Sequence, residues 1–325
     1  MIRKVLITGG AGYIGSILTA YMLDQGYEVV VLDDLSVGKL QNVDKRAKFI
    51  EGSILSKQSL QDALLGIDLV IHCAAKSLVG ESVEKPDLYH QVNIEGTKQL
   101  LAVMKELKVL NIIFSSSCAV YGQPEHLPIS EQDLCKPVSP YGATKLACDN
   151  LLAGETVNGL AAISLRFFNV GGSYKTTLGN WINETRDVET HLIPILIKQL
   201  ASKGQDGTIK VFGDKWPTPD GSCIRDYLHI QDLARAHLLA IGQLKVGKHK
   251  IYNLGAGHGS SVFEVINTAQ QVTARSIKTL IVELRSGDPA VLLADISKAG
   301  TELNWHPQFT LKDIVASSWQ GIGGS

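Results

Sequence analysis

The feature that most constrains the fold of this chain is a glycine-rich turn close to its N-terminus. Residues 4–8 form a short apolar segment typical of a buried strand, and Gly9, Gly12 and Gly15 follow it. A helical stretch comes next, and residues 28–33 are typical of a second strand. The pattern predicts a strand–helix–strand unit with parallel strands and with the glycines in its first turn.

This unit has the pattern of a dinucleotide-binding turn. Glycines allow the backbone to approach a pyrophosphate, and the N-terminus of the following helix favours its negative charge. Asp33 ends the second strand, eighteen residues after Gly15, where its carboxylate can accept hydrogen bonds from the adenosine ribose. Because this carboxylate would repel a 2′-phosphate and no Arg adjoins it, NAD is favoured over NADP. The alternative is a glycine turn without a ligand.

Four more apolar segments alternate with helical stretches in the first half of the chain. They cover residues 47–52, 68–75, 111–115 and 160–167. Strands that alternate with helices imply a parallel sheet. The predicted fold is therefore α/β, a doubly wound parallel Rossmann sheet with a smaller C-terminal α/β substrate lobe.

The pattern loosens beyond residue 172. We expect a nucleotide-binding domain over residues 1–172, to which segments near 231–255 return, and a smaller discontinuous lobe over residues 173–325. Residues 173–190 are polar and are expected to form a loop. Helices are expected at 191–200 and 232–241, and strands at 209–212, 224–230 and 251–254.

Composition excludes several classes of function. Hydrophobic residues make up 45% of the chain, charged residues 19%, and the net charge is −1, so no general attraction to nucleic acid or anionic membranes is expected. The five cysteines form no Cys-x-x-Cys pair, which indicates reduced thiols and no metal site. No signal peptide is expected, because the first predicted strand begins almost directly after Met1, and no apolar run reaches ~18 residues, so a cytoplasmic protein is expected.

Tyr141 and Lys145 are the strongest catalytic candidates. They are four residues apart and would lie on one face of a helix that begins near Ser139 and Pro140. A nearby ammonium stabilises a phenolate and lowers the tyrosine pKa from its ordinary value of roughly 10, which would make Tyr141 a general base. Such a pair alone is more often a surface feature of a helix.

Other candidates lie at strand ends or in a helix. Residues 111–115 are expected to present Ser115, Ser116 and Ser117 at the carboxyl end of a strand, where ligands bind in open α/β sheets. Residues 73–75 are small enough for a dinucleotide to pass, and residues 53–54 are placed to border the adenine. Asn93 lies in a helical segment, where its side chain can bind the cofactor or only form a local hydrogen bond.

Together these residues resemble the extended short-chain dehydrogenase/reductase family. The resemblance is most specific for its nucleotide-sugar 4-epimerases and extends in order along nearly the whole chain. The matching segments are 8–15, 70–75, 79–82, 114–117, 120–122, 139–145, 166–171, 217–221, 225–227 and 285–288.

The resemblance implies interconversion of UDP-glucose and UDP-galactose with tightly bound NAD. Tyr141 would take the proton of the sugar 4-hydroxyl while a hydride leaves C4 for NAD⁺. Lys145 would lower the tyrosine pKa and hydrogen-bond the nicotinamide ribose, and Ser117 would bond the 4-oxygen. The 4-keto sugar would turn over, and the hydride would return to its other face.

The resemblance also implies two sets of contact residues and a homodimer that pairs two long helices of the first domain. Arg225 and Arg285 would hold the diphosphate, and Asp288 would bond a uridine ribose hydroxyl. His191 would also line the substrate site, at a position where many relatives have Asn. The cofactor set is Gly9, Gly12, Tyr13, Ile14, Gly15, Asp33, Asp34, Leu35, Ser36, Ser53, Ile54, Cys73, Ala74, Ala75, Ser77, Asn93, Tyr141, Lys145 and Phe168. The substrate set is Ser117, Tyr141, Asn169, His191, Leu192, Lys210, Val211, Phe212, Arg225, Arg285, Asp288 and Leu292.

Alternative interpretations remain open at this point. Arg225 with Asp226 can be a plain surface ion pair, and Arg285 with Asp288 a local loop pair. A nucleotide-sugar 4,6-dehydratase would carry Asp-Glu directly after Ser117, but Cys118 and Ala119 stand there.

A 4-epimerase of UDP-pentoses or UDP-N-acetylhexosamines is harder to exclude than a dehydratase. The resemblance places Leu292 at the position that gates the substituent on C2 of the sugar in the epimerases. A bulky Tyr there would exclude an N-acetyl group, whereas a Leu is intermediate in size, so partial tolerance of UDP-GlcNAc is predicted. A non-catalytic NAD-sensing regulator is disfavoured, because such proteins commonly lose the Tyr or the Lys.

Overall fold

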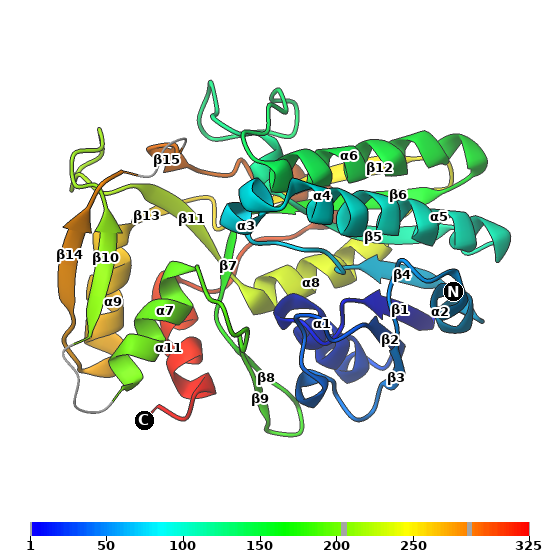
Figure 1. Cartoon of the computed structure of the whole chain (residues 1–325), viewed down its shortest axis with the longest axis horizontal. Coiled ribbons are helices and arrows are strands. Elements are labelled where there is room, and N and C mark those ends of the chain that lie inside the picture. Colours follow the sequence, from blue (N-terminus) through cyan, green and yellow to red (C-terminus); the bar gives the residue numbers. More distant parts are fainter. Residues whose placement is uncertain (1, 203–206, 285–287, 325) are drawn as a thin grey trace. The chain divides into compact units, whose positions relative to one another are not determined.

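The computed structural model describes residues 2–202, 207–284 and 288–324, which form two compact units (Figure 1). Unit 1 comprises Met1–Gly122, Leu134–Arg166 and Ala236–Tyr252, and unit 2 comprises Gln123–Asp133, Phe167–Arg235 and Asn253–Ser325. The changeover at Arg166–Phe167 lies six residues before the boundary expected at residue 172, and the returning segment is shorter than expected. The functional assignment of the two lobes stays a prediction.

A seven-stranded sheet with the order β12-β6-β5-β4-β1-β2-β3 is the centre of the α/β fold. The strands are β1 (Lys4–Thr8), β2 (Glu28–Asp33), β3 (Lys48–Glu51), β4 (Leu69–His72), β5 (Asn111–Ser117), β6 (Ala161–Phe167) and β12 (His249–Leu254). The pairs β1–β2, β1–β4, β2–β3 and β4–β5 are parallel. Because β2 and β4 flank β1 on opposite sides, the strand order reverses there, and this is the point where doubly wound sheets bind ligands. The predicted fold class is confirmed.

Helices follow the strands of unit 1. They are α1 (Tyr13–Asp24), α2 (Lys57–Leu64), α3 (Val79–Glu84), α4 (Pro86–Tyr89), α5 (Gly96–Glu106) and α6 (Pro140–Glu155), with the π-helical turn η2 (His90–Glu95) and the 3₁₀ turns η1 (Leu40–Asn42), η3 (Cys118–Val120) and η4 (Thr156–Asn158). Helix α8 (Ile230–Ile241) continues from unit 2 into unit 1. Helices α3, α4 and η2 all pack on α6, so the helix that carries Tyr141 is surrounded by neighbours.

The core of unit 1 lies between the sheet and helices α2, α5 and α6. Leu6, Val70 and Ile112 of the central strands are fully buried, and Leu60 of α2 and Leu100 of α5 join the same cluster. Continuous apolar strands of this kind are expected where both faces of a parallel sheet are covered. The sheet therefore gives a rigid platform to the residues at its carboxyl edge.

Unit 2 has its own strands and core. Its strands are β7 (Asn169–Gly171), β8 (Tyr174–Lys175), β9 (Trp181–Ile182), β10 (Thr208–Phe212), β11 (Ile224–His229), β13 (Gly259–Ser261), β14 (Lys278–Val282) and β15 (Val291–Leu292), and its helices are α7 (Leu192–Ala201), α9 (Val262–Thr273), α10 (Ser297–Leu303) and α11 (Leu311–Gly321). Strands β10 and β14 pair in parallel, and β11 pairs with β7, β13 and β15. Leu196, Ile266, Ile314 and Trp319 of three helices form the core.

Two local expectations from the sequence differ from the structure. The loop expected over residues 173–190 is wrong in part, because β8 and β9 pair there as a short antiparallel hairpin. Strand β5 runs two residues further than the expected 111–115, and the three serines are its last residues, at its carboxyl end as expected. The hairpin pairs residues six to eight positions apart, such as Tyr174 with Ile182, within a polar stretch that has no strand pattern of its own.

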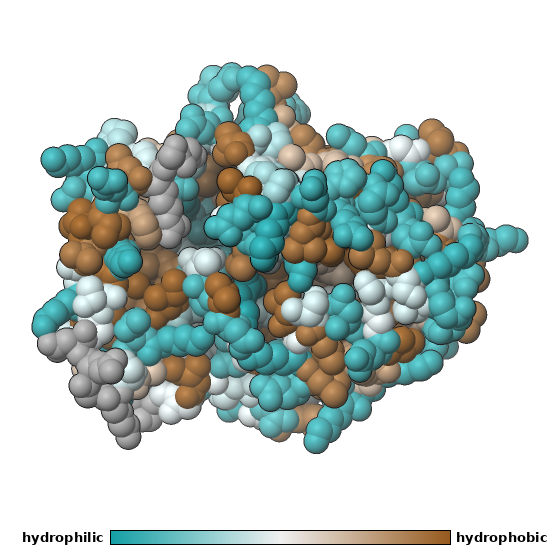
Figure 2. All heavy atoms as spheres, viewed as in Figure 1, coloured by the Kyte–Doolittle hydropathy of each residue, from teal (hydrophilic) through white to brown (hydrophobic). Residues whose placement is uncertain are grey.

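The surface and the helices give no sign of a membrane span. On the face drawn in Figure 2, hydrophobic residues lie between hydrophilic ones. Across the described ranges, no helix is both long enough and apolar enough to cross a bilayer.

The start of α6 yields the first prediction. The Ser139 hydroxyl accepts a hydrogen bond from the Gly142 N–H at 3.1 Å, and Pro140 occupies the first helical position. Ser139→Ala should therefore lower the free energy of unfolding of the protein by about 1 kcal/mol, as loss of an N-cap does elsewhere. Urea denaturation measures the change. Ser139→Asp keeps an N-cap acceptor and should stay close to wild type, and equal losses in both variants would contradict the capping role.

Candidate functional site

The side chains of Tyr141 and Lys145 lie one turn apart on α6, in the core of unit 1. Tyr141 is 8% exposed and Lys145 is 4% exposed. The Lys145 ammonium lies 5.9 Å from the centroid of the Tyr141 ring. The helix therefore brings the predicted pair together in a buried setting, which excludes the surface interpretation of their spacing.

The Lys145 amine is held by strand β5. Its Nζ donates to the carbonyl oxygen of Ser115 at 2.7 Å and lies 4.7 Å from the centroid of the Phe114 ring. Burial lowers the pKa of Lys145, while Cys148, Cys73 and Asp149 act in the opposite direction. A lysine in this position has a fixed amine whose charge depends on its few polar neighbours.

The three serines at the end of β5 have different partners. Ser115 contacts Cys73 at 3.2 Å, and the Ser116 hydroxyl donates to Asp149 Oδ2 at 3.2 Å. The Ser117 hydroxyl accepts from the Ala119 N–H at 3.2 Å and caps η3. Ser117 is 8% exposed, compared with 3% and 0% for Ser115 and Ser116. Ser117 is thus the serine least enclosed by the protein.

The glycine turn after β1 is shaped by internal packing as well as by space for a ligand. Gly9 has a φ of +71°, and a Cβ there would lie 2.7 Å from the Ala74 nitrogen. A Cβ on Gly15 would lie 2.1 Å from the Gly9 oxygen. At Gly12 the nearest atom would be 3.4 Å away, an ordinary contact. Two of the three glycines are therefore required by the close approach of backbone to backbone.

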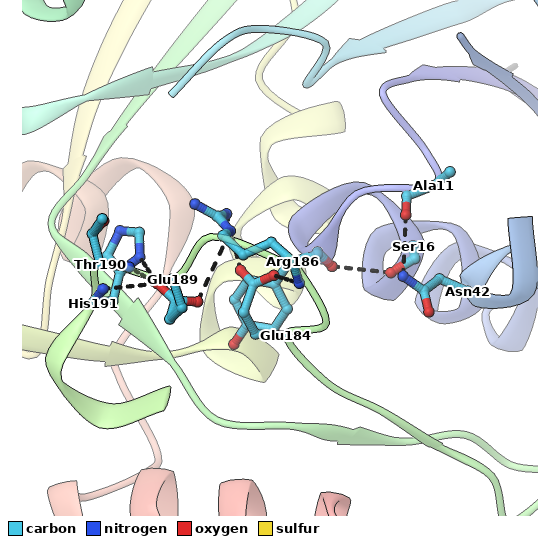
Figure 3. A network of polar contacts seen from close by, with 9 residues as sticks. Ala11, Ser16, Asn42, Glu184, Arg186, Glu189, Thr190 and His191 are labelled. Carbon is cyan, nitrogen blue, oxygen red and sulfur yellow. Dashed lines mark hydrogen bonds and ion pairs between the residues drawn. The ribbon is translucent and has the colours of Figure 1, made fainter. Parts of the chain in front are cut away.

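Asp33 organises the loop that follows β2. Its Oδ2 accepts from the Ala11 N–H at 2.9 Å and its Oδ1 from the Leu35 N–H at 2.8 Å. Burial raises the pKa of Asp33 against the effect of these two bonds. Leu35 has a φ of +56°, a conformation that a branched residue adopts only when its surroundings impose it. Asn42 Nδ2 ties the far end of the loop to the Ala11 carbonyl at 3.2 Å (Figure 3).

Asn93 is buried in the π-helical turn η2 and its side chain bonds far from its own segment. Its Oδ1 accepts from the Lys76 N–H at 2.8 Å, and its Nδ2 donates to the Lys76 carbonyl at 3.0 Å and to Thr144 Oγ1 at 2.9 Å. The interpretation of Asn93 as a locally bonded helix residue is therefore wrong. Its amide fixes the loop after β4, which contains the predicted cofactor residues Cys73 to Ser77, to helix α6.

His72 was not among the sequence candidates, yet it joins the glycine turn to this arrangement. Its Nδ1 lies 2.7 Å from Thr8 Oγ1 and its Nε2 lies 2.9 Å from Thr97 Oγ1. The Thr97 hydroxyl donates to the Asn93 carbonyl at 2.6 Å, so Nε2 is the nitrogen that carries the proton and Nδ1 accepts from Thr8. Burial, and then the charge of Lys145, lowers the pKa of His72 to about 3. The only sequence signal was a histidine inside an apolar strand.

The predicted substrate residues of unit 2 fall into two groups. Asn169 lies in β7, His191 and Leu192 lie at the start of α7, and Lys210, Val211 and Phe212 lie in β10. The second group lies together, because Arg225 pairs with Leu292 between β11 and β15 and its Nη2 lies 3.8 Å from Asp288 Oδ2. Arg285 lies outside the described residues. Phe168, from the cofactor set, is buried and donates its N–H to the Leu254 carbonyl at 2.9 Å.

Asp226 does not form a surface ion pair with Arg225. Its carboxylate is fully buried and accepts from the backbone N–H groups of Ala256, Gly257 and Ala294. Arg225 Nη1 instead donates to the carbonyls of Ile224 and Pro289, each at 2.9 Å. Asp226 therefore fixes the fold of unit 2, and the guanidinium is oriented by backbone oxygens.

Glu189 holds His191, another contact that the sequence did not indicate. Its Oε1 accepts from the Thr190 and His191 N–H groups at 2.7 Å and lies 2.6 Å from His191 Nδ1 (Figure 3). Burial opposes ionisation, but the contacts with His191 hold the pKa of Glu189 below its ordinary value. The same figure shows Arg186 paired with Glu184 at 2.9 Å. Together these pairs fix the segment that leads into α7.

The described residues contain no group of His, Cys, Asp or Glu side chains arranged to hold a metal ion. None of the five cysteines, all of which the structure describes, forms a disulfide bond.

Comparisons with known proteins agree with this geometry. Residues 5–255 match the model of the NAD dependent epimerase/dehydratase family. The chain belongs to this family. It is 45% identical over 320 residues to a UDP-glucose 4-epimerase from Corynebacterium glutamicum, covering 97% of this chain and 94% of that protein.

Solved structures of epimerases resemble the fold over nearly its full length. The UDP-glucose 4-epimerase from Brucella ovis in complex with NAD has a TM-score of 0.91 and 39% identity, covering 98% of both chains. The UDP-glucose 4-epimerase from Bifidobacterium longum in complex with NAD⁺ and UDP also has a TM-score of 0.91, with 35% identity over 99% of this chain and 98% of that chain.

The residues of unit 1 fit the dinucleotide that this NAD dependent family uses. Helix α1 begins at the glycine turn, and within the described residues no side chain caps its N-terminus. A helix end of this kind offers backbone N–H groups and a positive dipole end to a pyrophosphate. Asp33 stands at the end of the neighbouring strand, where a ribose is bound in such folds.

The lowered pKa of His72 yields a prediction for stability. An unfolded histidine titrates near ~6.5 and the native His72 at about 3, so between these values only the unfolded state binds a proton. Stability should therefore fall as the pH decreases. His72→Gln should lose about 2 kcal/mol less than wild type between pH 6.0 and pH 4.5 in urea denaturation. Equal losses would show that His72 does not stay neutral in the folded protein.

Proposed function

We propose that this chain interconverts UDP-glucose and UDP-galactose by oxidising and re-reducing C4 of the hexose. The observation that carries the proposal is the buried Tyr141–Lys145 pair, with the amine fixed on the Ser115 carbonyl beside the end of β5. The reaction needs a base that takes one proton and gives it back, and a phenol beside a fixed ammonium has this property. The similarity to epimerases over nearly the full chain supports the same reaction.

The cofactor is NAD, which when bound accepts a hydride from the sugar and later returns it. The α1 N-terminus and the glycine turn would hold its pyrophosphate, and Asp33 its adenosine ribose. Residues at the end of β4 and Lys145 would lie along its nicotinamide half.

The residues of unit 1 supply the proton chemistry. The Lys145 ammonium stabilises the phenolate form of Tyr141, which takes the proton from the 4-hydroxyl and becomes a phenol. The Ser117 hydroxyl bonds the 4-oxygen and keeps it close to the phenol. On re-reduction Tyr141 gives the proton back to the 4-oxygen. Because the hydride would also return to C4, the reaction consumes neither oxidant nor reductant.

We assign the UDP part of the substrate to residues of unit 2. Arg225 is a charge-assisted donor for the diphosphate, and Asp288 an acceptor for a uridine ribose hydroxyl. Arg285 completes this set. Asn169, His191, Leu192 and the backbone of Lys210, Val211 and Phe212 supply further contacts.

The experiment that tests the proposal uses one purified sample. The protein should carry NAD without any having been added, and it should equilibrate UDP-glucose with UDP-galactose. Tyr141→Phe should lower kcat by about 10²- to 10⁴-fold, because the phenolate of Tyr141 is the proton acceptor. Tyr27→Phe, outside the site, should keep full activity. A Tyr141→Phe enzyme with normal kcat, or a wild-type protein that epimerises no UDP-sugar, would contradict the proposed function.

The range of sugars is a separate proposal that concerns Leu292. Leu292 is half-buried and pairs with Arg225, the proposed diphosphate residue. A leucine there leaves more room for a substituent on the sugar C2 than a tyrosine would, so UDP-N-acetylhexosamines, like UDP-pentoses, are candidate substrates besides the plain hexoses.

Leu292→Tyr tests this assignment. The variant should lower kcat/KM for UDP-GlcNAc relative to that for UDP-glucose by about tenfold or more, because the larger side chain clashes with the acetyl group. Leu292→Met keeps the volume and serves as the matched control. Unchanged relative turnover in the tyrosine variant would remove Leu292 as the residue that sets the sugar range.

Two other classes of function are not favoured. A 4,6-dehydratase needs an acid and a base after Ser117, where Cys118 and Ala119 begin η3. A non-catalytic NAD sensor would not need the buried Tyr141–Lys145 pair. We also assign the enzyme to the cytoplasm and expect it to act as a homodimer, in line with the resemblance of its sequence to dimeric relatives.

A further inference from the structure

A buried ion pair in unit 1 joins Asp149 of α6, the helix that carries Tyr141 and Lys145, to Arg166 of β6. Arg166 Nε donates to Asp149 Oδ2 at 2.9 Å, and the two side chains are only 4% and 2% exposed. Arg166 Nη1 also donates to the Tyr121 hydroxyl at 3.0 Å, and its guanidinium lies 5.1 Å from the centroid of the Tyr121 ring. A buried ion pair is weak evidence for added stability, because both charges lose their hydration. Its retention calls for another reason.

The position of Asp149 on α6 suggests that reason. Tyr141, Lys145 and Asp149 follow one another at intervals of four residues, so all three lie along one face of the helix. Asp149 Oδ2 accepts from both Arg166 and the Ser116 hydroxyl. Asp149 Oδ1 is buried and has no hydrogen-bond partner among the described residues. One oxygen of the carboxylate therefore has two donors, and the other has no hydrogen-bond donor among the described residues.

The other groups around Lys145 are neutral at physiological pH. Burial lowers the pKa of His72 to about 3 and raises that of Cys73 to about 11, and it also raises that of Cys148. The groups that face the amine from the surrounding elements are His72 and Cys73 near β4, Phe114 and the Ser115 carbonyl of β5, and Tyr141, Cys148 and Asp149 of α6. Asp149 is the carboxylate in this set.

We propose that Asp149 is a positioning residue of the reaction: held by Arg166 and Ser116, its carboxylate is the anion that keeps the buried Lys145 amine protonated. This inference rests on the proposed function, in which the Lys145 ammonium stabilises the Tyr141 phenolate. The Arg166 guanidinium and the Ser116 hydroxyl fix the Asp149 carboxylate on α6, one turn from Lys145. Burial alone would favour the neutral amine, which cannot stabilise a phenolate.

The test is the pH profile of kcat for the enzyme with its bound cofactor. Activity should rise as the phenol ionises and fall as Lys145 loses its proton. Asp149→Asn removes the charge at constant size and should move the falling limb to lower pH by about one unit, the low end of the effect of a neighbouring charge. Loss of a merely structural contact would instead lower kcat by one factor at every pH.

Matched variants separate charge from packing. Asp149→Glu keeps the anion and should keep the falling limb within a few tenths of a unit of wild type. Ser116→Ala removes only a neutral hydrogen bond to the carboxylate and should also keep it. Because Asp149→Asn leaves Arg166 buried without its partner, a double variant with Arg166→Met provides a second route. It should shift the falling limb in the same direction by a smaller amount, because the loss of the Arg166 cation partly offsets the loss of the anion.

The outcomes are distinguishable from failure of the proposed function. A wild-type enzyme that does not epimerise UDP-sugars overturns the function itself. An active wild type whose falling limb is unchanged in Asp149→Asn, or in the double variant if the single variant does not fold, overturns only the role of Asp149. A shift in the Asn variants that Asp149→Glu restores establishes it.

Discussion

The hydrogen bond from the Lys145 amine to the Ser115 carbonyl is the interaction on which the site depends. It fixes a cation in the core of unit 1, between the carboxyl end of β5 and helix α6. Burial works against that charge, and the structure opposes the effect with a backbone oxygen, an aromatic face and a carboxylate one turn away. A phenol beside such a fixed ammonium can lose and regain a proton without help from solvent.

Hydrogen bonds between the surrounding residues connect this interaction to the glycine turn that follows β1. A one-way series of hydrogen bonds runs from Thr8, at the end of β1, through His72 and Thr97 to the carbonyl of Asn93. The Asn93 side chain then binds Thr144, between Tyr141 and Lys145. The glycine turn, the end of β4 and the catalytic helix are thus coupled through buried, satisfied polar groups, which resist displacement because any broken member would be left without a partner.

Sequence patterns predicted the parts of the fold that depend on local order. The bounds of β1 and β2 match the expected segments, and Ser139 with Pro140 begins α6 as expected. The π-helical turn at Asn93, the proton position on His72 and the burial of Asp226 were not predictable, because each depends on partners from distant segments. Asp149 was not among the candidates for the same reason, because its buried ion pair depends on Arg166, which lies in β6.

In the proposed reaction one carbon is oxidised and reduced in turn, and Tyr141 takes and returns the proton of the 4-hydroxyl. The most direct measurement uses UDP-glucose that carries deuterium at C4, incubated with the purified enzyme in ordinary water. The account predicts that the UDP-galactose formed keeps the deuterium at C4, because the hydride returns to the carbon that it left. Replacement of the label by solvent hydrogen would show epimerisation by proton removal from carbon and would contradict the account.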